Sequence, residues 1–142
     1  MGDNLDLSSL VQAAGDGIIA ADPDGIILLW NPAAKRIFGF RPEEALGHSL
    51  DLIIPERLRQ RHWEGYQRVM QTGQTQYGHE VLRVPALHKN GRTISIAFTV
   101  ALLRFGSGKI QAIAAFVREE TARWEEERAL RRRLSELEAR SK

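Results

Sequence analysis

The sequence contains no cysteine. This absence excludes disulfide bonds, thiolate nucleophiles, cysteine-ligated zinc and thiol adducts to a chromophore. Long apolar runs are also missing, since none approaches the roughly 18 residues of a membrane-spanning helix, and the amino end lacks the pattern of a signal peptide. The 20 Lys and Arg residues nearly balance the 18 acidic ones, and a net charge of +2 offers little attraction for phosphates. We therefore expect a cytoplasmic protein with no direct nucleic-acid or membrane partner.

The chain has 142 residues, of which 43% are hydrophobic, so it can bury one core. We predict one domain with an appendage at each end: a helical cap over residues 1–15, the domain over 16–118 and a separate helix over 119–142. The cap is predicted from apolar residues on one helical face, which are Leu5, Leu7, Leu10 and Val11.

A β-hairpin is predicted directly after this cap. Two apolar runs, 17–22 and 26–30, flank Pro23-Asp24-Gly25, in which proline presets the turn and glycine accepts a positive φ. Asn31 and Pro32 follow, and this pair is typical of a helix start, with Asn31 as the cap.

The second half predicts one longer helix over 55–72 and then three strands over 80–87, 93–104 and 109–118. Asn90-Gly91 and Gly106-Ser107-Gly108 are the hairpin signals between these strands. Two strands, a series of helices and three further strands predict an α+β fold with a five-stranded antiparallel sheet.

The strand over 93–104 has two unlike faces. One face carries the large apolar residues Ile94, Ile96, Phe98, Val100 and Leu102, while the residues between them are small. We expect the bulky face to line an interior.

The last 24 residues form a segment of a different kind. The segment 119–142 has neither proline nor glycine, and Leu130, Leu134 and Leu137 are spaced by four and three. This spacing favours a parallel dimer seam, although a helix that lies back across its own domain would show the same leucines.

These elements together resemble the PAS sensor domains of bacterial signalling proteins. The resemblance covers residues 6–124 and rests on an ordered series: GIIAADPDGIILLWNPAAKRIFGF, RPEEALGHSLDLIIPERLRQRHWEGY, HKNGRTISIAF and VREETARW. It implies a pocket enclosed by the sheet and the small helices on one face of it, and a homodimer that signals through its last helix to a kinase, cyclase or transcription regulator. Where the family commonly has Asp-x-Thr before that helix, this chain has Glu119-Glu120-Thr121.

The resemblance leaves the ligand open, because PAS domains bind haem, flavins, small acids or nothing. His62 matches the position of the proximal histidine in the haem-PAS oxygen sensors of enteric bacteria, and an iron bound by both His62 and His79 would need a local shift of the chain. The alternative for His62 is a hydrogen-bonded histidine packed under the sheet. The candidate cofactor-binding residues are therefore His62, His79, Trp30, Ile96, Phe98 and Val100, with His62 as the metal ligand.

Trp30 has two interpretations as well. It can stack on a non-covalent flavin, or it can be a partly buried ring that closes one end of the hairpin. A third hypothesis is a ligand-free interaction module, whose interior is filled by Ile96, Phe98, Val100 and Leu102. We expect no enzymatic activity, because the chain shows no nucleophile–base pairing and no glycine-rich phosphate loop.

Overall fold

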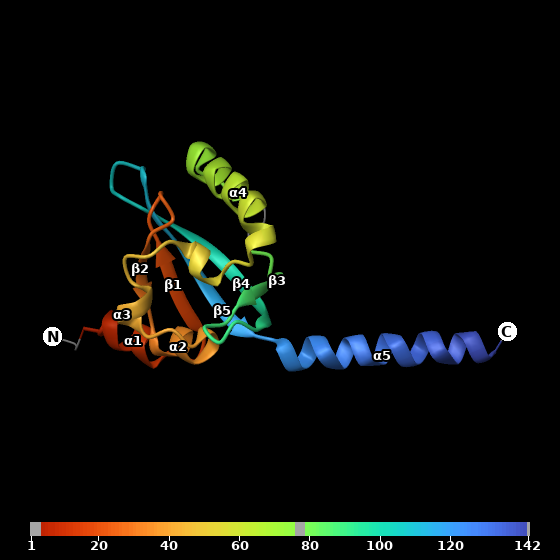
Figure 1. Ribbon diagram of the computed structural model, residues 1–142. Coiled ribbons are helices and arrows are strands. Elements are labelled where there is room, and N and C mark those ends of the chain that lie inside the picture. The colour runs from red at the N-terminus through yellow and green to blue at the C-terminus, as the bar shows by residue number, and fades with distance from the viewer. Residues whose placement is uncertain (1–3, 76–78, 142) are drawn as a thin grey trace.

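The computed structural model describes residues 4–75 and 79–141, and it contains a five-stranded antiparallel sheet (Figure 1). The strands are β1 (Gly17–Ala21), β2 (Ile27–Trp30), β3 (Leu82–Leu87), β4 (Thr93–Arg104) and β5 (Ile110–Glu119), in the order β2-β1-β5-β4-β3. The predicted α+β fold is confirmed. The first two β-segments join the last three through the pairing of β1 with β5.

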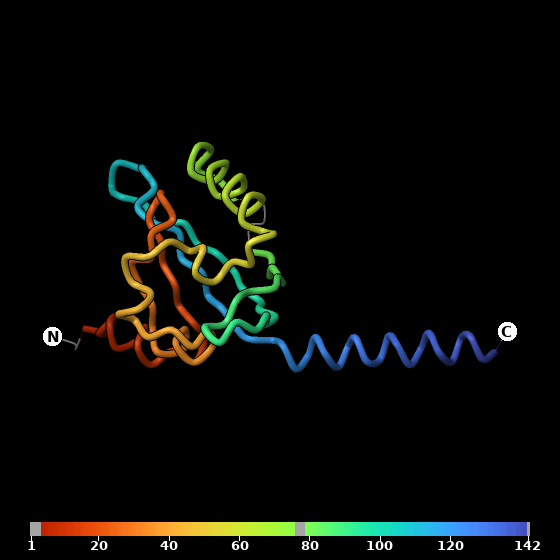
Figure 2. The backbone as a smooth tube through the Cα atoms, viewed as in Figure 1, coloured from red at the N-terminus to blue at the C-terminus, as the bar shows by residue number. Residues whose placement is uncertain are grey.

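The order of the strands places β5 in the centre of the sheet. The chain leaves the sheet after β2, passes through the helices, returns at the opposite edge as β3 and moves inward through β4 to β5 (Figure 2). β5 pairs with β1 along one side and with β4 along the other. It then continues into the terminal helix α5 (Thr121–Arg140), so the central strand of the sheet is the one that leads out of the domain.

The connection between β2 and β3 supplies the helices of the domain. They are α2 (Pro32–Phe38), α3 (Pro42–Ala45), the 3-10 turns η1 (Leu50–Ile53) and η2 (Glu56–Leu58), and α4 (Arg59–Thr72). The core lies between these helices and the sheet, where Phe38 and Ala45 pack with Ile19, Ile94 and Val117. None of these five side chains is more than 3% exposed.

Asn31 connects α2 to the hairpin and is completely buried. Its Oδ1 accepts hydrogen bonds from the N–H groups of Ala34 (3.0 Å) and Ile18 (2.8 Å). Its Nδ2 donates to the carbonyl oxygens of Val11 (2.9 Å) and Asp16 (3.1 Å). The predicted helix cap is confirmed, and the same side chain also ties β1 and the segment before it to α2.

The turn between β1 and β2 is held by Asp22. Its Oδ1 accepts hydrogen bonds from Asp24 N and Ile26 N, at 2.9 and 3.0 Å. Gly25 has φ of 80°, which an L side chain rarely adopts. Glycine is therefore required at position 25 because the turn needs a positive φ, as the sequence predicted.

The two ends of the chain extend from this body. Asp6 caps α1 (Leu7–Ala13) by accepting from Ser8 N and Ser9 N, while Leu7 and Leu10 remain exposed. α5 runs away from the domain as a separate rod (Figures 1 and 2). No helix in the described part of the chain is both long enough and apolar enough to cross a bilayer.

Several predicted boundaries differ from the structure: the strands expected over 17–22, 26–30 and 109–118 are each displaced by one residue at one or both ends, and two differences are larger. The helix expected over 55–72 begins as α4 only at Arg59, because the 3-10 turn η2 occupies residues 56–58. The strand expected from residue 80 begins at Leu82, and the residues directly before it pair with no neighbouring strand.

Candidate ligand site and output junction

The first feature of the candidate site is α4, which is anchored to the β1–β2 turn by two aromatic side chains. Trp63 Nε1 donates to Asp51 Oδ1 at 2.7 Å, and the Trp63 ring lies so close to Gly25 that a Cβ there would meet it at 2.1 Å. The Tyr66 hydroxyl donates to the carbonyl oxygen of Asp22. Burial raises the pKa of Tyr66, so the hydroxyl keeps its proton for this bond.

The carboxyl end of α4 is attached to the turn between β4 and β5. The Arg104 guanidinium, at the end of β4, donates to the carbonyl oxygens of Gly73 and Gly108. Gly73 ends α4 in the left-handed conformation, with φ of 70°. α4 is therefore attached at the end of the sheet that carries the β1–β2 and β4–β5 turns, as Figure 1 shows.

His62 lies on α4 beside these aromatic anchors. Its ring centroid is 4.6 Å from that of Trp63 and 5.7 Å from that of Tyr66. Burial lowers the pKa of His62 below its ordinary value of 6.5, although the nearby Asp51 carboxylate acts in the opposite direction. The imidazole is therefore neutral at pH 7, which is the form that binds iron.

The Nδ1 atom of His62 is buried and has no hydrogen-bond partner among the described residues. The alternative prediction, in which His62 is a hydrogen-bonded packing residue, is therefore not supported at this nitrogen. An unpaired buried polar atom is costly, and a ligand that reached it would remove the cost. The neutral, partly buried imidazole of His62 therefore has the properties that an iron-binding histidine needs.

The candidate residues of β4 differ in burial along the strand. Ile96 is buried in the core at 6% exposure, and Phe98 packs against that core while half-buried. Val100 is also half-buried and shares their face, because side chains two residues apart along a strand point to the same side of the sheet. The interior is therefore tightly packed near the start of β4 and less so toward α4.

Trp30 and His79 lie in unlike surroundings. Trp30 is only 4% exposed, its Nε1 donates to the Phe40 carbonyl oxygen at 2.9 Å, and the rings of Phe38 and Phe40 pack around it. This environment is that of a core residue. His79 is exposed in the turn before β3. The structure thus joins Trp30, Ile96 and Phe98 in one core, with His62 on α4 and His79 at the surface.

The second feature is the junction between β5 and α5, which only Glu120 separates. Ser95 of β4 bonds to the junction residue and to the first residue of α5: its carbonyl oxygen accepts from Glu120 N at 2.7 Å, and its N–H donates to Thr121 Oγ1 at 3.1 Å. Pro85 lies opposite Ser95 on β3. The backbone groups of Ser95 are therefore directed to the output helix.

A series of ion pairs leads from the sheet edge into α5. Glu120 Oε2 is 3.1 Å from Arg83 Nε on β3, and Glu120 Oε1 is 3.7 Å from Arg123 Nη1. Arg123 Nε in turn lies 3.3 Å from Glu127 Oε1. The resemblance placed the family's carboxylate at Glu119, but Glu119 is exposed and Glu120 makes these pairs. The motif alone did not distinguish the two adjacent glutamates.

The comparisons with known proteins agree with this architecture. The family model of the PAS fold matches residues 5–119. The chain belongs to the PAS family. A crystal structure of a PAS domain from Colwellia psychrerythraea superposes with a TM-score of 0.71 at 16% sequence identity, and the match covers 82% of this chain and 95% of that one.

Two relatives of this PAS chain are named as sensors. Sensor protein FixL of Bradyrhizobium diazoefficiens is 28% identical over 131 residues, which are 92% of this chain and 26% of that protein. Oxygen sensor protein DosP of Escherichia coli strain K12 is 33% identical over 48 residues, which are 34% of this chain and 6% of that protein. The chain thus spans only a small part of the length of the curated relatives it matches.

Proposed function

We propose that this PAS chain is the sensory input module of a larger signalling protein, and that it binds a small ligand between α4 and the sheet. The observation that carries the proposal is the junction at Glu120, where the central strand β5 passes into α5 and Ser95 of β4 bonds to both Glu120 and Thr121. Two relatives named as sensors support the same function. The module itself is not catalytic and works in the cytoplasm.

The proposed signal passes along β4. This strand carries Phe98 and Val100 on its inner face and, a few residues earlier, Ser95 at the junction. A ligand that displaces β4 moves Ser95, and the hydrogen bond to Thr121 transmits the movement to the first turn of α5. This coupling is a physical hypothesis, since it requires two arrangements of the junction.

The three segments predicted from the sequence keep their roles in this proposal. We assign a docking role to the segment 1–15, which contains α1, ligand binding to 16–118, and output toward a kinase, cyclase or transcription regulator to 119–142, which contains α5. The protein acts as a homodimer, because the leucines near both ends of the chain are exposed in a single copy: Leu5, Leu7, Leu10, Leu130, Leu134 and Leu137. Each is a large apolar side chain that a second copy can cover.

The ligand part of the proposal is tested by chemical extraction. We expect purified full-length chain to release a small molecule on denaturation, detected by liquid chromatography and mass spectrometry. Val100→Trp adds bulk where β4 is half-buried, and we expect it to abolish the retained molecule while the fold persists by circular dichroism. If wild type and Val100→Trp both release nothing, the ligand-free interaction module becomes the better account.

Haem is the specific ligand that one observation favours. His62 offers a neutral imidazole with a buried, unpaired Nδ1, and one relative is named an oxygen sensor. When bound, haem would supply an iron centre that takes up gases or changes redox state. His62 would hold it, and His79 would need to move from the surface to contribute a second ligand.

Titration with haemin tests this candidate. We expect a Soret band with saturable binding, lost in His62→Ala and kept in His48→Ala, because His48 is exposed in a loop. A change of the band in His79→Ala would support the second ligand. A preparation that stays colourless with haemin contradicts the haem candidate but leaves other ligands possible.

A further inference from the structure

A groove lies outside the interior of the domain, between the edge strand β3 and the beginning of α5. It has a volume of about 490 Å³ and is open to solvent. Arg83 and Pro85 line it from β3, and Trp124, Arg128 and Arg131 line it from α5. None of the residues that we assign to the ligand between α4 and the sheet lines this groove. It is therefore a separate candidate site.

The α5 wall of the groove is a stripe of three side chains. Trp124, Arg128 and Arg131 are four and three residues apart, so they share one face of the helix. The Arg128 guanidinium carbon lies 5.2 Å from the centroid of the Trp124 ring, which is a cation–π contact. Trp124 is 48% exposed. The stripe thus presents an aromatic ring and two cations toward the sheet.

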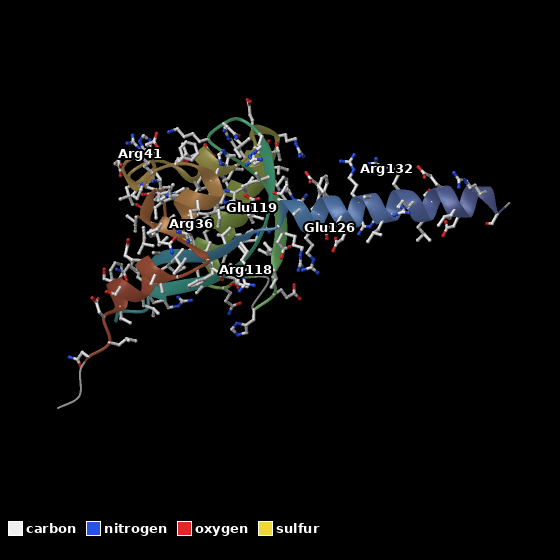
Figure 3. All side chains as sticks on the ribbon, turned by 90° about the horizontal axis from the view of Figure 1, so that it is seen from below. Arg36, Arg41, Arg118, Glu119, Glu126 and Arg132 are labelled. Atoms are coloured by element: carbon white, nitrogen blue, oxygen red, sulfur yellow. The ribbon has the colours of Figure 1, made fainter. Side chains whose placement is uncertain are left out.

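Exposed charge alone does not distinguish this face of α5, because charged side chains project from the helix along its length (Figure 3). The difference is in the charge balance. The Glu127 carboxylate also lines the groove, but its Oε1 already lies 3.3 Å from Arg123 Nε. Within the part of the chain that the structure describes, neither Arg128 nor Arg131 makes an ion pair. Both guanidinium groups are therefore available to an anion.

The sheet supplies a third guanidinium, that of Arg83. Its Nε donates to Glu120 Oε2 at 3.1 Å, while its two terminal nitrogens have no hydrogen-bond partner among the described residues. The Arg83 side chain is 55% exposed. Guanidinium groups bind phosphate oxygens through two parallel N–H groups, and they stay charged at any ordinary pH. Two elements of the fold therefore bring three such groups to one groove.

The edge of β3 beside the groove does not suit an added peptide strand. The backbone groups of Ser95 point to the junction, because they bond to Glu120 and Thr121. Pro85 pairs with Ser95, so the backbone of Pro85 points away from β4, toward the free edge. Proline has no N–H, and an extended peptide would find one donor missing within β3. The groove is better suited to a ligand that binds side chains.

We propose that this groove binds a small molecule that carries a chain of phosphate groups. Arg83, Arg128 and Arg131 bind the phosphate oxygens, and a chain of phosphates spreads these oxygens over the distance between two elements. The volume of the groove is within the range of about 300–1,000 Å³ that is usual for small-ligand sites. A nucleoside triphosphate and inorganic tripolyphosphate share this chemistry, and the exposed ring of Trp124 distinguishes them by stacking on a base.

Such a ligand bridges β3 and α5 and holds the beginning of the output helix against the sheet. The groove is thus a second input, which acts on α5 directly. The inference goes beyond the proposed function, because it needs neither the ligand between α4 and the sheet nor the homodimer. The leucines assigned to the dimer seam do not line the groove, so both surfaces can be occupied at once.

Isothermal titration calorimetry of the full chain with ATP tests the site, at low ionic strength and without divalent cations. We expect saturable binding of one ATP per chain, and a dissociation constant about tenfold higher in Arg128→Gln and in Arg131→Gln. Arg133→Gln is the matched control, because it removes the same charge about two and a half turns after Trp124, on the opposite side of α5. It should change the constant by less than about twofold.

Tripolyphosphate distinguishes the two sources of the phosphate chain. If the ligand is a nucleotide, Trp124→Ala should weaken ATP about tenfold and tripolyphosphate less than about threefold. If both anions bind equally well and respond alike to Trp124→Ala, the site is specific for the phosphate chain alone. No saturable binding of either anion at millimolar concentration overturns the proposal. Equal effects of Arg131→Gln and Arg133→Gln also overturn it, because they would show non-specific attraction only.

A last comparison separates this site from the proposed function. Val100→Trp fills the interior beneath α4, and it should leave ATP binding within about twofold of wild type. If Val100→Trp abolishes ATP binding, the nucleotide occupies the interior and the groove proposal is wrong. Amide hydrogen exchange adds a readout of position: ATP should slow exchange in β3 and in α5 from Trp124 to Arg131. Exchange that slows only in α4 and β4 would also contradict the groove, whatever the extraction experiment finds.

Discussion

At the scale of single residues, Asn31 has the most constrained surroundings in the fold. Its amide group is fully buried and has two acceptors and two donors around it, from α2, β1 and the segment before β1. The sequence indicated the helix cap, because Asn before Pro is typical of a helix start. The bonds to Val11 and Ile18 could not be predicted, since they depend on how distant segments pack.

We expect Asn31→Ala to lower the free energy of unfolding by about 2–4 kcal/mol, because it removes the cap and leaves buried backbone groups unpaired. Asn31→Asp is the matched variant, since it keeps the acceptor oxygen and loses the donor to Val11 and Asp16. The free energy of unfolding of Asn31→Asp should lie between those of Asn31→Ala and wild type. Urea denaturation measures both, and a loss below about 0.5 kcal/mol for Asn31→Ala would contradict the role given to this side chain.

His62 is expected to make the stability depend on pH. Because burial lowers its pKa in the folded chain, the unfolded chain takes up the proton first as the pH falls. The contribution of His62 is therefore full above pH 6.5 and decreases as the pH drops from 6.5 toward the lowered folded pKa. The free energy of unfolding should decrease over that window.

His62→Leu should flatten this part of the pH profile, while His48→Gln in the exposed loop should keep the wild-type slope. Urea midpoints measured from about pH 7.5 down to about pH 5 supply the comparison. A slope unchanged in His62→Leu would mean that this imidazole is not the titrating group.

At the scale of elements, turn chemistry made most of the fold predictable. Pro23-Asp24-Gly25 and Asn90-Gly91 marked the hairpins, and the strand over 93–104 matches β4 residue for residue. The start of α4 could not be placed, because a 3-10 turn and an α-helix share the same local residue preferences.

The candidate site was less predictable than the fold. Helical spacing placed His62 and Tyr66 on one face, but it did not indicate that Trp63 would pack on Gly25 or bond to Asp51. The choice of Glu120 over Glu119 depends on the direction in which β5 ends. Both features depend on tertiary packing, which local sequence patterns do not predict.

The junction gives a prediction at this scale. Thr121→Val keeps the shape of the side chain and removes the oxygen that accepts from Ser95 N–H. We expect a loss of about 1 kcal/mol in stability and faster amide hydrogen exchange at Ser95 and in the first turn of α5. Arg132→Ala, farther along the helix, serves as the control. Exchange rates that match wild type at Ser95 would show that this bond does not hold α5.

At the scale of the whole molecule, the domain and α5 are joined mainly through Glu120, Thr121 and Arg123. Ending the chain after Trp124 keeps these contacts and removes the leucines. We expect the truncated chain to retain the thermal stability of the domain to within a few degrees and to dimerise much more weakly. Sedimentation velocity measures the second effect, and an unchanged dimer would assign the interface to α1 or the sheet.

Native mass spectrometry of the full chain tests in one spectrum whether this PAS module is the homodimer that we propose and whether it holds a small ligand. A single chain has a mass of 16.0 kDa. We expect a species of twice that mass plus the mass of one small molecule for each copy. Collisional activation should remove the small molecules and leave the bare dimer. A spectrum that contains only the unmodified single chain would contradict this expectation.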